Sequence, residues 1–111
     1  MFQKDMNIGV LLDFYGDLLT PHRRQALNDY YNEDMSLSEI AEEMGISRQG
    51  VRNLIKCAEE ELRRYEEKLA LADRFSRAKS AMAKVSEKAE QEGVSEELKQ
   101  ALIALSDILT E

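Results

Sequence analysis

The strongest constraint on the fold is the segment from residue 36 to residue 57, where signals for two helices stand on either side of a tight turn. Ser36 and Glu39 have the spacing of a capping box, in which each side chain satisfies a backbone N–H at the start of a helix. Gly45 can adopt the left-handed backbone that ends a helix, and Ser47 can begin the next one after a single intervening residue. Two short helices joined by so short a turn predict a helix-turn-helix.

The side chains of this segment meet the packing demands of the same motif. A small residue is needed where the two helices touch, and Ala41 stands there, four residues before Gly45. Apolar residues are needed to fill the angle between the helices, and they are present in register as Ile40, Met44, Ile46, Val51 and Leu54. We therefore expect the motif core to consist of these seven positions, Ala41 and Gly45 included.

The second helix of the motif carries a candidate nucleic-acid-binding face. Its outward positions are polar or basic: Arg48, Gln49, Arg52, Asn53 and Lys56. Arginine can form two hydrogen bonds to guanine, and Gln or Asn can do the same with adenine, whereas Lys56 is better placed for a phosphate. The alternative is an ordinary solvated face, or a contact surface for another protein, and the sequence leaves DNA, RNA and protein targets open.

Charge is distributed unevenly along the chain. The 111 residues carry a net charge of −7, which argues against a protein that coats nucleic acid. The segment 46–57 nevertheless contains three basic residues and no acid, whereas the segments before and after it are acidic. Because salt screens charges beyond about 8 Å, a distant acidic surface need not cancel this local basic one.

The rest of the chain predicts an all-α protein. Apolar spacing of three and four residues indicates helices over 7–19, over 21–31 after an N-cap at Thr20, and over 96–109 after an N-cap at Ser95. No stop signal stands between Arg48 and Gly93, and a continuous helix there would be about 60 Å long. We expect it to bend, to break or to meet a partner.

Two parts are expected: a helix-turn-helix bundle over residues 1–70 and a helical C-terminal part over 71–111. The apolar stripe of the final helix, Leu98, Ala101, Leu102, Leu105 and Leu109, could cover a stripe of the preceding helix in a hairpin. Such a hairpin buries each stripe on one side only, so we expect two copies to form a homodimer with a four-helix core.

Other function classes are disfavoured. No apolar stretch approaches a membrane span, no signal peptide is evident, and the single Cys57 cannot form an internal disulfide, so a cytoplasmic protein is expected. His22 has no companions at metal-ligand spacing, and Cys57 has no base beside it, so we expect no metal, no cofactor and no enzymatic activity. The acidic runs 59–61 and 66–67 are expected to be solvated helix faces.

The chain also resembles a known family. Short runs at 11–15, 18–20, 30–31, 36–43, 47–49, 55–56 and 65–69 are similar to those of the YlxM family of Gram-positive bacteria, and the likeness extends over about residues 5–75. The helix-turn-helix itself resembles region 4 of bacterial sigma factors, where Ser-Leu-x-Glu-Ile-Ala is a familiar run. Two positions depart from the family pattern: Gly50 replaces a usual alanine, and Arg52 replaces a usual aromatic residue.

The resemblance implies a role beside the signal recognition particle, since the family is encoded next to its GTPase. Two hypotheses remain. One is a dimeric, DNA-binding regulatory protein; the other is an accessory protein that contacts the GTPase of the signal recognition particle, its RNA, or RNA polymerase. The acidic bulk of the chain suits a basic partner in the second case.

Overall fold

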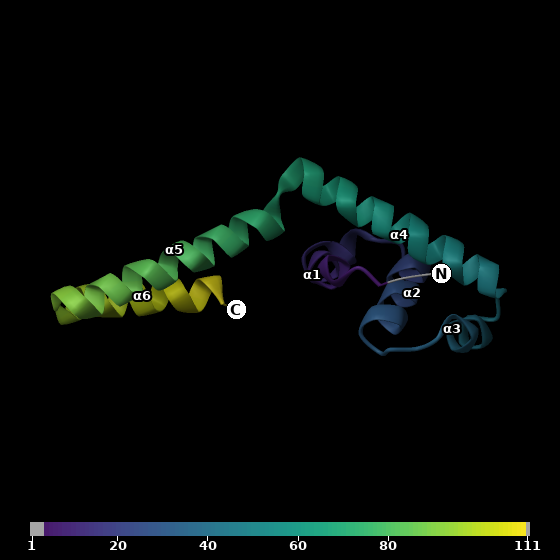
Figure 1. The fold of residues 1–111 in the computed structure, drawn as a ribbon, viewed down its shortest axis with the longest axis horizontal. Coiled ribbons are helices and arrows are strands. Elements are labelled where there is room, and N and C mark those ends of the chain that lie inside the picture. Colours follow the sequence, from purple (N-terminus) through teal and green to yellow (C-terminus); the bar gives the residue numbers. More distant parts are fainter. Residues whose placement is uncertain (1–3, 111) are drawn as a thin grey trace. The chain divides into compact units, whose positions relative to one another are not determined.

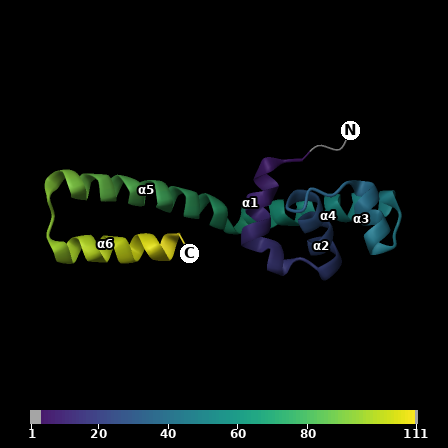
Figure 2. The ribbon, with the colours of Figure 1, turned by 90° about the horizontal axis from the view of Figure 1, so that it is seen from below.

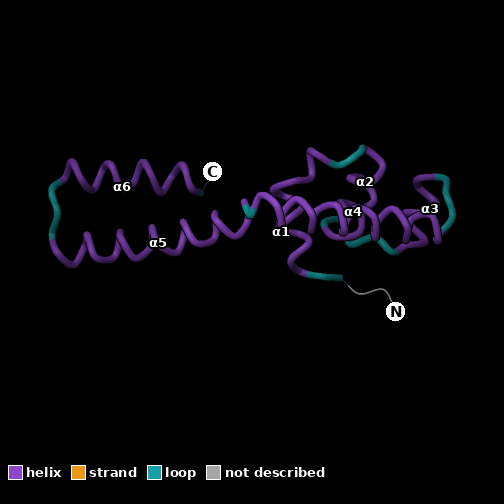
Figure 3. The backbone as a smooth tube through the Cα atoms, turned by 90° about the horizontal axis from the view of Figure 1, so that it is seen from above, coloured by secondary structure: helices purple, strands orange, loops and turns teal. Residues whose placement is uncertain are grey.

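The structure, a computed structural model, describes residues 4–110, and every regular element in that range is helical (Figure 3). The chain divides into two compact units, one ending at Ala70 and the other beginning at Leu71. None of the helices in the described range is both long and apolar enough to cross a membrane.

The first unit is a bundle arranged along one long helix. The helices α1 (Met6–Tyr15), α2 (Pro21–Tyr31) and α3 (Leu37–Met44) all pack against α4 (Arg48–Leu69), as Figure 1 shows. Apolar residues of α4 at spacings of three and four form the centre of the core, and they are buried: Val51, Ile55, Ala58 and Leu62. The second helix of the predicted motif is thus held along much of its length by the rest of the unit.

The first helix is shorter than its apolar spacing predicts. The expectation of a helix over 7–19 is wrong at its C-terminal end, because α1 stops at Tyr15 and a 3₁₀ turn, η1 (Gly16–Leu18), follows. The tighter turn still directs Leu19 into the core, where it is buried. Thr20 stands at the N-cap of α2 without a side-chain hydrogen bond, and Pro21 occupies the first turn as predicted.

The long helical stretch breaks. Ala70 has a left-handed backbone with φ of 52° and ends α4, with its N–H bonded to the Glu66 carbonyl. Left-handed geometry is disfavoured for a residue with a Cβ, so an alanine is not expected to end a helix in this way. The sequence around Ala70 also contains no glycine or proline that would mark the end of α4.

The second unit is a hairpin of two antiparallel helices. The helix α5 (Leu71–Glu92) turns at Gly93, whose φ is 65°, into α6 (Glu96–Leu109), which Ser95 caps. Figure 2 shows the two helices side by side. Met82 and Ala89 of α5 are buried, but no residue of α6 is.

Candidate nucleic-acid interface

The turn between α3 and α4 has the geometry that the sequence predicts. Gly45 has φ of 70°, and the N–H of Ile46 bonds to the Ala41 carbonyl at 3.1 Å. Ser36 and Glu39 form the predicted capping box, with both hydrogen bonds present. The Ser47 hydroxyl accepts a hydrogen bond from the N–H of Gly50 at 2.9 Å and begins α4. Two helices therefore meet across a turn of three residues, 45–47.

The inner side of the motif is packed, with one exception. Ile40, Ala41 and Val51 are buried, and Met44 and Leu54 are half-buried. Ile46 was expected to fill the angle between the helices, but 40% of its surface is exposed. Its Cδ1 lies 3.5 Å from the place where a Cβ on Gly50 would stand, so Ile46 covers the glycine at the surface instead of entering the core.

The five predicted contact residues lie together on the exposed side of α4. Arg48, Arg52 and Lys56 follow one another at intervals of four, so they form one row along the helix. Gln49 and Asn53 form the neighbouring row, and the Gln49 side-chain amide donates to Asn53 Oδ1 at 3.2 Å. All five side chains are exposed, so α4 presents two polar rows at the surface of the first unit.

The electrostatics of this face favour an anion at one end. The N-terminus of α4 carries the positive end of its helix dipole, and its first turn contains no acidic residue. The neighbouring helix α3 has the opposite character, because Glu42 and Glu43 are exposed. The Glu39 carboxylate accepts a hydrogen bond from the Ser36 N–H at 3.0 Å, which holds the pKa of Glu39 below its usual value.

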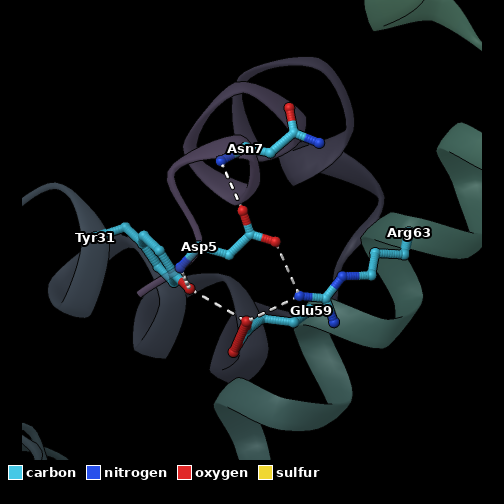
Figure 4. Close-up of polar contacts among 5 residues, drawn as sticks. All are labelled: Asp5, Asn7, Tyr31, Glu59 and Arg63. Atoms are coloured by element: carbon cyan, nitrogen blue, oxygen red, sulfur yellow. Dashed lines mark hydrogen bonds and ion pairs between the residues drawn. The ribbon is translucent and has the colours of Figure 1, made fainter. Parts of the chain in front are cut away.

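A polar network that the sequence did not reveal fixes α4 to α1 and α2 (Figure 4). The Tyr31 hydroxyl donates to Glu59 Oε2 at 3.1 Å and accepts from the Asp5 N–H at 3.2 Å. Arg63 pairs with Asp5 at 3.3 Å and with Glu59 at 3.5 Å. Since Asp5 also caps α1 through the N–H of Asn7, one cluster joins three helices.

Burial governs the acid–base behaviour of this network. Burial raises the pKa of Tyr31 to about 12. The hydrogen bond from the Asp5 N–H lowers this pKa, whereas the nearby charge of Glu59 raises it further. Burial also raises the pKa of Glu59, although the Tyr31 hydrogen bond and the charge of Arg63 partly offset it. Glu59, which we expected to be solvated, is thus buried and contacts Tyr31 of α2 and Arg63 of α4.

The prediction that both acidic runs form solvated faces is therefore wrong for three of their members. Glu59 is buried, and Glu61 accepts hydrogen bonds from Arg23 at 2.5 Å and from Tyr65 at 2.7 Å. Glu66 accepts from the Tyr15 hydroxyl at 2.6 Å. Apart from Tyr65, which lies one turn along α4, the partners come from α1 and α2, tens of residues away, so sequence spacing within α4 gave no sign of them.

His22 and Cys57, which the sequence did not favour as site residues, are both exposed. His22 lies in the first turn of α2 and Cys57 lies on α4 beyond Lys56.

The fold and the motif define an all-helical helix-turn-helix protein, and comparison with known proteins gives the family. A family model described as "Putative helix-turn-helix protein, YlxM / p13 like" matches residues 2–102. A UPF0122 protein of Bacillus cereus is 41% identical over 109 residues, which cover 97% of this chain and 99% of that protein. UPF0122 proteins of Bacillus anthracis and Bacillus thuringiensis match to the same extent. The chain belongs to the UPF0122, YlxM/p13-like family.

Proposed function

We propose that this protein is a DNA-binding regulatory protein that acts by binding and not by catalysis. The observation that carries the proposal is the double row of exposed polar side chains at the start of α4, in the second helix of a well-formed helix-turn-helix. This is the helix that enters the major groove in proteins of this class. The N-terminal Arg48 and Gln49 would reach base edges, and Lys56 would contact a phosphate.

We also propose that it acts in the cytoplasm as a homodimer, since helix-turn-helix proteins commonly read two half-sites with two recognition helices. The exposed apolar residues of the hairpin support this idea. Val85 and Leu105 are each about half exposed, at 46% and 47%, and apolar patches of this kind are rare on soluble monomers.

Binding to a pool of random 30-base-pair duplexes, measured by fluorescence anisotropy at several salt concentrations, tests the proposal. Replacing Arg48 and Arg52 by Ala should weaken binding about tenfold or more and reduce the dependence of log K on log salt. The matched control replaces Arg64 and Lys68, two exposed basic residues farther along α4, and removes the same charge. Equal binding by the wild type and the Arg48/Arg52 variant would contradict the proposal.

A second candidate is an accessory protein that contacts components of the signal recognition particle or RNA polymerase. The exposed Glu42 and Glu43 on the neighbouring helix α3 favour this candidate. Acidic residues close to the exposed side of α4 repel phosphates and attract a basic protein. A pull-down from lysate with and without nuclease separates the candidates. Partners that survive nuclease support the accessory role, whereas their loss supports nucleic-acid binding.

A further inference from the structure

The hairpin carries an apolar surface that its own packing leaves open. The helix α6 is rich in Leu, Ile and Ala, yet none of its residues is buried. Leu98, Leu105 and Ile108 are 46%, 47% and 64% exposed. An amphipathic helix normally gains its stability by burying its apolar side, so this helix has more apolar surface than α5 alone covers.

Helix geometry separates the residues that line the groove between α5 and α6 from those that face away from it. The groove between the helices is lined on its inner side by Met82, Ser86 and Ala89 of α5 and by residues of α6 that face them, namely Leu102, Ser106 and Leu109. Each residue one position earlier is rotated by about 100° around its helix. Because α5 and α6 are antiparallel, this rotation is toward the same side of the hairpin on both helices. The residues one position before the inner residues therefore share one face of the hairpin.

That shared face is mostly apolar, whereas the opposite face carries several acidic residues. We define the apolar face by the apolar residues one position earlier, with Leu98 added: Ala81, Val85, Leu98, Ala101, Leu105 and Ile108. The remaining earlier position, which precedes Ala89, is the basic Lys88, and it lies at the border of this face. Ala81 and Ala101 are small and exposed, which would let another helix approach closely. The residues one position later include Glu87, Glu90 and Asp107. They would repel a second copy of the same surface.

The charges beside the apolar face are self-complementary in only one arrangement. On α5 its outer border carries the exposed Lys84 and Lys88, and on α6 it carries the exposed Glu97. If α5 of one copy stacks on α6 of the other, each basic border lies along an acidic one. If α5 stacks on α5, two basic borders meet and repel.

We propose that the apolar face of the α5–α6 hairpin is the site at which a second copy of this chain docks, with α5 of each copy stacked on α6 of the other. The two-fold axis then runs parallel to the helices, and every neighbouring pair in the four-helix core is antiparallel. This rests on the homodimer of the proposed function and specifies its surface. Because the test measures mass and not nucleic-acid binding, its failure is distinct from that of the DNA-binding proposal.

Sedimentation equilibrium of the full chain tests the surface. The wild type at micromolar concentration should have twice the 12.7 kDa mass of one chain, and Leu105→Glu should reduce it to a single chain. The matched control is Ile103→Glu, which adds the same charge to the same helix on the opposite face at a similar exposure of 53%. A monomeric wild type, a dimeric Leu105→Glu variant, or equal dissociation by both variants would each overturn the proposal.

Surface charge variants test the stacking without endangering the fold. Lys88→Glu should weaken dimerisation about two- to tenfold, as expected for two exposed ion pairs replaced by repulsion. Adding Glu97→Lys should restore it, whereas adding the control Glu96→Lys, on the other side of α6, should not. If Lys88→Glu strengthens the dimer or leaves it unchanged, α5 does not lie on the partner's α6. Circular dichroism would establish that each variant keeps its helix content.

Discussion

At the scale of single residues, α4 is held in place by glutamate side chains that form hydrogen bonds and ion pairs. Glu61 is held from two sides, by the Arg23 guanidinium of α2 and by the Tyr65 hydroxyl one turn along α4. Burial alone would raise the pKa of Glu61, but these hydrogen bonds and the charge of Arg23 lower it. A lowered pKa in the folded state means that the ionised carboxylate stabilises the fold.

Glu61→Gln should therefore cost about 1 kcal/mol of unfolding free energy at pH 7, because it removes the charge that Arg23 faces. The contribution is present above the ordinary pKa of a glutamate and is lost as the pH falls through the lowered pKa of Glu61. Urea denaturation at a series of pH values should show the variant and wild type converging in acid. The exposed Glu60→Gln serves as the control, and an equal loss in both variants would contradict the role of Arg23.

A second prediction at this scale concerns Ala41, which is 7% exposed in the motif. Because a leucine there would overpack the junction of α3 and α4, Ala41→Leu should destabilise the protein by about 1–3 kcal/mol. Thermal melting measures the loss, with the exposed Glu43→Leu on the same helix as the control. An unchanged melting curve for Ala41→Leu would argue against this register of the motif.

At the scale of elements, local signals predicted what is local. The capping box at Ser36, the left-handed Gly45 and the cap at Ser47 each act within a few residues, and all three were predicted correctly. The Arg48–Lys56 row followed from helix periodicity alone. The burial of Glu59 was missed because Tyr31, its hydrogen-bond donor, lies 28 residues away.

The end of α4 was missed for a different reason. Ala70 has good helix propensity, and only its backbone, at φ of 52°, shows that the helix ends there. No composition signal marks such a site.

Ala70→Gly should relieve the strained backbone and stabilise the first unit by about 0.5–1 kcal/mol, after allowance for the greater freedom of glycine in the unfolded chain. The same substitution within a regular helix, Ala83→Gly, should instead cost about 1 kcal/mol. Denaturation followed by circular dichroism compares the two. If both variants lose stability, α4 and α5 form one continuous helix in solution.

At the scale of the whole molecule, the two units divide between them the features that the proposed dimeric, DNA-binding role requires. The first unit contains the motif and the side chains that hold α4, while the second contains the apolar face. The core of the first unit is made from its own residues, from Ile8 to Leu62. We therefore expect the first unit to fold without the hairpin.

A chain that ends at Ala70 should accordingly remain folded and become monomeric. It should bind duplex DNA more weakly than the full chain, with about half the dependence of log K on log salt, because one recognition helix in place of two releases half the counterions. Sedimentation gives the mass, thermal melting gives the stability, and anisotropy gives the slope. The full-length Leu105→Glu variant should match the shortened chain in slope. A shortened chain that still dimerises would place the contact in the first unit, and one that unfolds would mean that the first unit needs the hairpin for its stability.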